Sequence, residues 1–198
     1  MRYQMQFAMW AVTACLLGSA AQAQTVLSVD PGSQTVTAGT DFTVDVNIAN
    51  VSGLYGYQFD LSFNPSVLSA VSSSEGSFLT KGGSTFFIPG TNDNTHGVVS
   101  GTADTLLSNS KGASGSGNLV VFTFDAIKSG FSAITISGAE LINSSFGSIS
   151  SSTTGGSVTV GGMKAPEIDP SSALGAITLL AGGLLLLRDR SSRRSNQR

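Results

Sequence analysis

The sequence predicts an all-β protein built as a β-sandwich or jelly roll. Large apolar residues occupy every second position from Tyr55 to Phe63, and Gly56, Gln58 and Asp60 lie between them. Successive side chains of a strand point to opposite faces, so this stretch is typical of a strand with one buried face. Similar stretches recur about every 8–15 residues between 24 and 162, separated by turn residues and without a sustained helical period.

The expected strands follow from the same two-residue alternation, taken along the chain. They are residues 25–29, 34–36, 42–48, 55–63, 67–71, 77–80, 84–88, 96–103, 118–127, 133–137, 140–142 and 157–160. An Asn-Pro-Ser turn at residues 64–66 ends the central strand, because proline cannot donate to a strand ladder. The stretches 108–117 and 144–156 are rich in Ser, Thr and Gly, which predicts surface loops.

Composition favours a single domain and excludes some functions. The chain has 198 residues, of which 11% are charged and 24 are glycine. Cys15 is its one cysteine, so thiol chemistry is not expected in the mature domain. Between Gln24 and Met163, nine acidic residues face three lysines, a net charge of −6. Nucleic acids are bound through clustered lysine and arginine, so this charge argues against nucleic acid as a partner.

The N-terminus resembles a cleavable signal peptide over residues 1–23. Arg2 supplies a positive charge, residues 7–17 form an apolar segment, and Ala21 and Ala23 give the small-x-small pattern that signal peptidase cleaves. We expect cleavage before Gln24, and hence export. A lipoprotein signal that uses Cys15 is the alternative.

The middle of the chain resembles a cohesin domain from about residue 26 to residue 160. The resemblance lies in VDPG at 29–32, AGTDFTV at 38–44, LSFNPSVL at 61–68, GSFL at 76–79, GVV at 97–99 and VFTF at 121–124. It implies a jelly-roll sandwich of about nine strands, similar also to carbohydrate-binding modules, over residues 24–161. It further implies binding of a dockerin-type partner protein, with calcium held by that partner and no cofactor in this domain.

The family's partner-binding positions match Gly56, Gln58 and Asp60, on the outward face of the strand before the Asn-Pro turn. Gly56 has no side chain where well-known members carry an amide, and Gln58 is neutral where they carry a carboxylate. For Gln58 and Asp60, a solvated strand face without a binding role is the alternative. Tyr55 and Tyr57 share the apolar alternation, which predicts that they pack in the core.

The C-terminus, residues 166–198 after a linker at 162–165, resembles a PEP-CTERM sorting signal. Its motif contains Pro166, Glu167, Asp169 and Pro170, and it continues into an apolar segment at 173–187 and an arginine-rich tail. The resemblance implies cleavage by an exosortase at the inner membrane of a Gram-negative bacterium. As a helix the apolar segment would span about 22 Å, short of the roughly 30 Å hydrocarbon core, although a permanent anchor in the membrane remains the alternative.

No pattern of catalytic residues emerges, and we expect no enzyme activity and no metal site. The one histidine, His96, lies in a polar stretch (91–97) typical of a turn. The sequence therefore predicts an exported, non-catalytic interaction module of the cell surface or extracellular matrix. Binding of extracellular polysaccharide is the alternative, with Phe86 and Phe87 as the nearest candidate aromatics, although one of two adjacent residues on a strand should point inward. A structural matrix component without a specific ligand is a third possibility.

Overall fold

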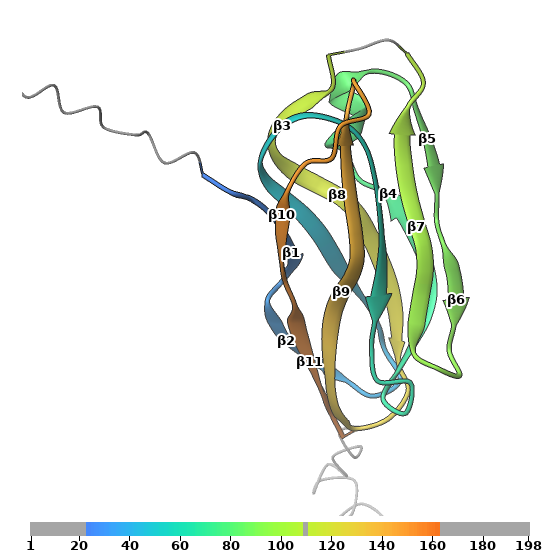
Figure 1. Ribbon diagram of the computed structural model, residues 1–198. Helices are drawn as coiled ribbons and strands as arrows, with labels where there is room; N and C mark the ends of the chain where they lie inside the picture. Colours follow the sequence, from blue (N-terminus) through green and yellow to red (C-terminus); the bar gives the residue numbers. More distant parts are fainter. Residues whose placement is uncertain (1–22, 109–110, 163–198) are drawn as a thin grey trace, which may run out of the picture.

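The computed structural model shows two layers of β-strands packed face to face, which share one long strand (Figure 1). Residues 23–108 and 111–162 are described. They contain eleven strands and one short 3₁₀ helix, so the predicted all-β fold is confirmed. The bounds are β1 (Thr25–Asp30), β2 (Ser33–Thr37), β3 (Asp41–Ser62), β4 (Leu68–Glu75), η1 (Leu79–Gly82), β5 (Thr85–Ile88), β6 (Thr91–Asp93), β7 (Val98–Leu106), β8 (Ala113–Ala126), β9 (Gly130–Asn143), β10 (Ser151–Thr154) and β11 (Gly156–Gly161).

The long strand β3 divides its pairing between the two layers. Its first half, residues 41–49, pairs with β1 and β8, which in turn pair with β10 and β4. Its second half, residues 54–62, pairs with β9 on one side and β7 on the other. The second layer then continues through β11 and β2 beyond β9, and through β5 and β6 beyond β7.

The corner at which β3 leaves one layer for the other is fixed by hydroxyl groups of β8. Asn50 and Gly53 have positive φ values of 57° and 66°. The hydroxyl of Ser116 accepts a hydrogen bond from the Asn50 amide at 3.1 Å, and that of Ser114 accepts one from the Gly53 amide at 2.8 Å. A Cβ atom at Gly112 would overlap the backbone of Gly53, so the close approach of these two segments requires glycine at position 112.

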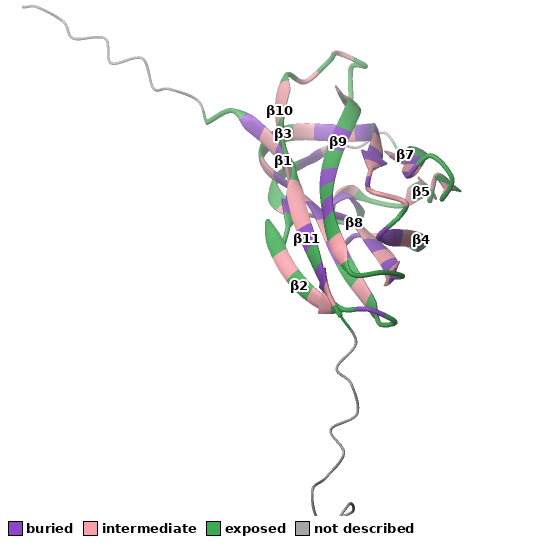
Figure 2. Cartoon of the chain, turned by 90° about the horizontal axis from the view of Figure 1, so that it is seen from below, coloured by how far each residue is buried: buried purple, intermediate pink, exposed green. Residues whose placement is uncertain are grey.

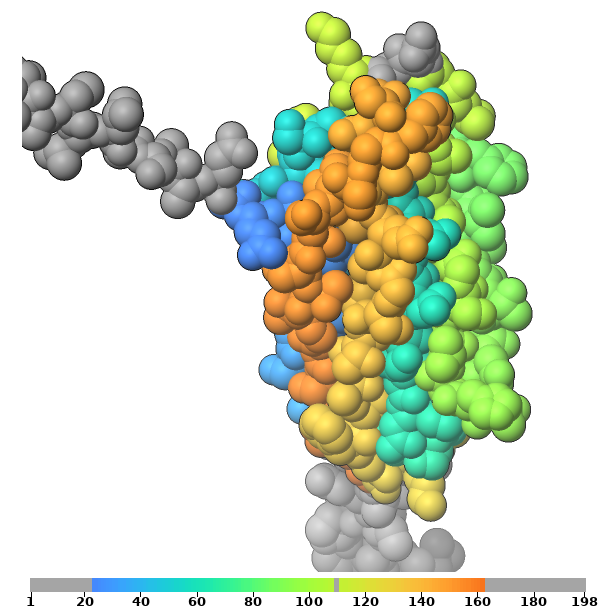
Figure 3. Space-filling model, viewed as in Figure 1, coloured from blue at the N-terminus to red at the C-terminus, as the bar shows by residue number. Residues whose placement is uncertain are grey.

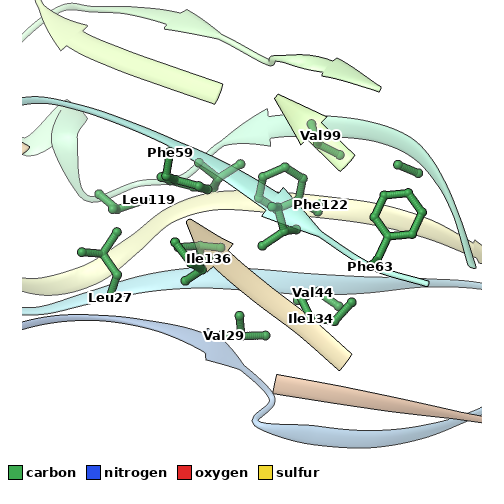
Figure 4. Close-up of a cluster of buried hydrophobic side chains, with 14 of the residues drawn as sticks. Leu27, Val29, Val44, Phe59, Phe63, Val99, Leu119, Phe122, Ile134 and Ile136 are labelled. Atoms are coloured by element: carbon green, nitrogen blue, oxygen red, sulfur yellow. The ribbon is translucent and has the colours of Figure 1, made fainter. Parts of the chain in front are cut away.

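The hydrophobic core fills the space between the layers. Buried and exposed residues alternate along the strands, as the two-residue period requires (Figure 2). Tyr57, Phe59, Leu61 and Phe63 are at most 6% exposed, and Tyr55 is partly buried against the same cluster, which confirms their predicted packing. Phe59 meets Phe122 of the opposite layer edge to face, with ring centres 6.2 Å apart (Figure 4).

Three local predictions were wrong. Residues 77–80 are expected as a strand, but 77–78 form a turn and 79–80 begin η1, with Phe78 and Leu79 buried. The segment 108–117 is not wholly a loop, since β8 begins at Ala113 and runs beside the second half of β3. Within 144–156, residues 151–154 form β10, which pairs in parallel with β1. Small polar residues conceal such strands because they lack the alternation of large apolar residues that marks a half-buried strand.

Candidate functional site

The candidate site lies on the outer face of the second layer, where Figure 3 shows teal β3 between β9 on its left and green β7 on its right. Gly56, Gln58 and Asp60 all point to this face, as predicted, because their neighbours Tyr57, Phe59 and Leu61 point to the core. The three positions nevertheless differ in their surroundings.

Gly56 forms the floor of an apolar pocket of about 190 Å³. In the ladder it lies between Thr105 of β7 and Ile142 of β9. A Cβ atom at Gly56 would stand 3.1 Å from the Asp104 carbonyl oxygen and 3.3 Å from the Thr105 hydroxyl, so the depression depends on the absence of a side chain. The walls include Gln58, Phe86, Ile88, Glu140 and Ile142.

The exposed apolar wall of the pocket comes from the edge strand β5. Phe86 and Ile88 are 57% and 44% exposed, whereas Phe87 between them is partly buried against the core. The prediction that one of the two adjacent phenylalanines points inward is confirmed. A phenylalanine and an isoleucine exposed side by side at a pocket supply apolar area that a partner protein can bury.

The polar wall of the pocket is a pair of side chains from β3 and β9. The Gln58 amide nitrogen donates a hydrogen bond to Oε2 of Glu140 at 3.1 Å. Both side chains are exposed, and 82 positions separate them in sequence. Glu140 places a negative charge beside the apolar wall, so the pocket combines an apolar surface with one acceptor for a cationic or amide group.

Asp60 has a role within the fold. Its Oδ1 accepts a hydrogen bond from the Gly101 amide at 2.8 Å. Gly101 has a φ of 69°, and the register of β3 against β7 shifts between Phe59 and Leu61. Asp60 therefore holds the irregular part of the β3–β7 ladder in place.

Three phenylalanines are exposed in the described residues, and they stand on separate elements. Phe86 lies on β5, Phe131 is 60% exposed near the start of β9, and Phe146 is 73% exposed in the turn after β9. Phe146 has a φ of 58° and packs edge to face on Tyr55, with ring centres 5.8 Å apart. The rings do not form the flat row that would favour a carbohydrate-binding surface.

His96 lies in a turn, as predicted. The Asp93 carboxylate accepts hydrogen bonds from the amides of Thr95 and His96, both at 3.0 Å, and lies 2.7 Å from the His96 ring. These contacts with His96 lower the pKa of Asp93. Among residues 23–108 and 111–162, no group of three or more His, Cys, Asp or Glu side chains could hold a metal ion.

Sequence reasoning missed one buried carboxylate behind this face. Asp104 of β7 is 3% exposed, and no N–H or hydroxyl group of the described residues forms a well-aligned hydrogen bond to its carboxylate oxygens. Burial and the neighbouring Glu75 raise its pKa to about 7. The alternation of Thr102, Asp104 and Leu106, all buried, is the one sequence signal that could have revealed it.

The predicted processing sites lie outside the part of the chain that can be described. Ala21 and the sorting motif at Pro166, Glu167, Asp169 and Pro170 belong to residues 1–22 and 163–198, and Ala23 is the first described residue. The predicted C-terminal apolar helix lies there too. Across the described ranges, no helix has the length and apolar character to cross a membrane.

Comparison with known proteins identifies two regions. Residues 27–160 match the cohesin domain family, and residues 165–195 match the VPEID-CTERM protein sorting domain. Ala165 to Asp169 read APEID, which shares four of the five letters of that name, so Ile168 belongs to this variant of the sorting motif. A search of curated proteins finds no match.

Solved cohesin structures share the fold. A non-cellulosomal cohesin from the archaeon Archaeoglobus fulgidus is 23% identical with a TM-score of 0.55, covering 70% of this chain and 92% of the other. The sixth cohesin of Acetivibrio cellulolyticus scaffoldin B, solved with a Cel5 dockerin, is 18% identical with a TM-score of 0.57, covering 70% and 100%. A Clostridium thermocellum cohesin in the Coh-OlpA–Doc918 complex is 12% identical with a TM-score of 0.57, covering 70% and 99%.

The similarity to solved cohesins extends over the whole length of a domain. Those solved chains are covered almost completely, and every buried core residue of the described chain lies between Leu27 and Val160. We therefore expect residues 24–162 to fold on their own. With a matching family model over two thirds of its length, this chain belongs to the cohesin domain family, and its domain is a non-catalytic protein-interaction module.

Proposed function

We propose that the domain binds a dockerin-type protein module through the outer face of β5, β7, β3 and β9. The observation that carries the proposal is the apolar pocket over Gly56, with exposed Phe86 and Ile88 on one side and the Gln58–Glu140 pair on the other. An apolar anchor beside a polar acceptor is the usual anatomy of a specific protein interface. Calcium would enter through the partner, since dockerins of this family hold it.

The match to a sorting domain supports export and cell-surface association. We further propose that signal peptidase removes residues 1–23 and that an exosortase of a Gram-negative bacterium cleaves near Pro166, after the C-terminal segment has held the chain in the inner membrane. The domain would then act outside the cell, where dockerin-bearing proteins or extracellular polysaccharide are available to it.

The proposed processing predicts defined ends for the mature protein. Mass spectrometry of the protein isolated from its native host is expected to find an N-terminus at Gln24 and a C-terminus close to Pro166. A signal peptide and a sorting signal are both removed by design, so neither should persist. An intact Arg198 in the mature protein would contradict the exosortase step and favour a permanent anchor.

The binding face is tested with purified residues 24–162 as bait for the native secretome and extracellular polysaccharide, with and without EDTA. We expect retention of a protein with dockerin-type repeats, lost on chelation. The captured module, purified and calcium-loaded, should then bind directly in calorimetry. Retention of polysaccharide both with and without EDTA would instead support carbohydrate binding. If neither protein nor polysaccharide is retained, a structural matrix role is favoured.

The position of the interface is tested by two matched substitutions. Phe86→Asp, at the pocket, should weaken binding of the captured module at least tenfold, because it places a charge where apolar area is buried. Phe131→Asp changes a phenylalanine of similar exposure near the opposite end of β9 and should leave the affinity within about twofold. Equal losses in the two variants, or a loss only in Phe131→Asp, would contradict the proposed face.

A further inference from the structure

The buried carboxylate Asp104 is directly behind the pocket. In the ladder it stands between Tyr57 of β3 and Phe87 of β5, so its side chain points to the core side of β7. Asp104 and its two sequence neighbours, Ala103 and Thr105, are all among the residues that line the pocket. A movement of the backbone at Asp104 would therefore change the shape of the pocket.

Glu75 reaches the same position from β4, in the other layer. Its carboxylate accepts a hydrogen bond at 2.6 Å from the hydroxyl of Thr85, the first residue of β5. Glu75 acts on Asp104 both through its charge and through a hydrogen bond between the two side chains, and both effects raise the pKa of Asp104. The two carboxyl groups thus join three strands: β4, β5 and β7.

No cation compensates this pair. In residues 23–108 and 111–162 the one ion pair is that of His96 with Asp93. The third titratable group in the cluster, Tyr57, donates its hydroxyl hydrogen to the Leu119 carbonyl at 2.9 Å. Burial, followed by the charges of Asp104 and Glu75, raises the pKa of Tyr57, so this hydroxyl stays neutral and supplies no charge.

Two adjacent carboxylates without a cation repel each other, and they attract only when a proton lies between them. We propose that Asp104 and Glu75 share one proton and that this proton fastens the β5–β7 edge of the binding face to β4. Loss of the proton places a negative charge on buried Asp104 beside that of partly buried Glu75, and it loosens β5, which carries Phe86 and Ile88. The effect of this proton on partner binding rests on the proposed function, whereas the sharing of the proton by Asp104 and Glu75 is independent of that function.

The direction of the pH dependence follows from the two states. The ordinary pKa of an aspartate is 3.8, and in the folded protein that of Asp104 is about 7. The folded state therefore binds more protons than the unfolded state between these values, and stability falls as the pH rises from about 4 to about 7. Above that range the group is ionised in both states, and its contribution becomes constant.

Carbon-detected NMR titration of residues 24–162 tests the shared proton directly. The Asp104 carboxyl carbon should titrate with a midpoint near pH 7. A midpoint for Asp104 near 3.8 would overturn the proposal. No partner is present, so this outcome is independent of whether the domain binds a dockerin.

Amide hydrogen exchange tests whether the shared proton holds strands β5 and β7 against β4. Corrected for base catalysis, exchange at residues 86–88 and 103–105 should rise at least tenfold between pH 6 and pH 8.5, whereas residues 158–160 of β11 should not change. Equal changes in the two regions would overturn the local effect. Restored protection at pH 8.5 on addition of Ca²⁺ or Mg²⁺ would also overturn it, because the pair would then be a cation site.

Substitutions test whether the shared proton, and not another titrating group, causes the pH dependence of amide exchange at the β5–β7 edge. Asp104→Asn is nearly isosteric and supplies a permanent N–H donor to Glu75, so the pH dependence of exchange at the edge should vanish. Glu75→Gln should have the same effect from the other side and covers the case in which Asp104→Asn does not fold. Asp41→Asn changes an exposed aspartate at the start of β3 and should retain the wild-type dependence. Dependence that persists in both pair variants would contradict the proposal.

Discussion

Phe59→Ala is expected to lower the free energy of unfolding of residues 24–162 by about 3–5 kcal/mol, the usual cost of removing a buried phenylalanine. Phe59 is 1% exposed, stacks on Tyr57 with ring centres 5.8 Å apart and meets Phe122 of the opposite layer. The cavity therefore opens between the layers, where neither sheet can close it without bending.

Urea denaturation followed by tyrosine fluorescence measures this loss. Phe86→Ala, which removes the same ring from an exposed position, is the matched control and should cost less than about 1 kcal/mol. A loss below about 1.5 kcal/mol in Phe59→Ala would show that the layers do not pack on this ring.

Gly97→Ala is expected to destabilise the domain by about 2–4 kcal/mol, through backbone strain and steric overlap together. Gly97 has a φ of 72°, and its carbonyl accepts a hydrogen bond from the Phe63 amide at 2.8 Å. A Cβ atom there would overlap the Phe63 carbonyl oxygen and stand 2.6 Å from Cδ of Pro65. The turn after β6 and the Asn-Pro turn after β3 would have to move apart.

Gly101→Ala separates the two causes. Gly101 has almost the same φ, 69°, but no atom within 4 Å of the added Cβ. Its alanine variant should therefore cost only the backbone strain, about 1 kcal/mol. Thermal or urea unfolding of both variants measures the difference. Equal losses would mean that the close approach of the two turns does not constrain the fold.

The central strand could be predicted because its alternation is local information. Tyr57 and Phe59 point inward and Gln58 outward for the same reason, the two-residue period, and no distant residue is needed to say so. The family resemblance then placed the candidate face on this strand. Both statements depend on residues that are close in sequence.

What could not be predicted depends on residues that are far apart. Glu140 belongs to the site because it contacts Gln58, 82 positions away in the sequence. Neither stretch of sequence contains a signal that predicts this contact. Ser114 and Ser116 look like loop residues, but their hydroxyls fix the corner of β3. Asp104 looks like a surface residue by type, and only the pairing of β7 with β3 and β5 shows that it faces inward.

The pairing of the ends of the domain sets the order in which it can be completed. β1 and β2, the first strands, pair in parallel with β10 and β11, the last two. β3, which follows them, belongs to both layers and finds its other partners at residues 98–143. Such non-local contacts cannot form until the later residues are present.

For an exported chain this order has a consequence at the membrane. While the first strands emerge outside, their partners are still on the other side, and neither layer can close around its core. On the proposed route of export, the domain would therefore cross unfolded for nearly its full length. Its folding would be completed only after Gly161, the last residue of β11, is outside, because β11 pairs with β2.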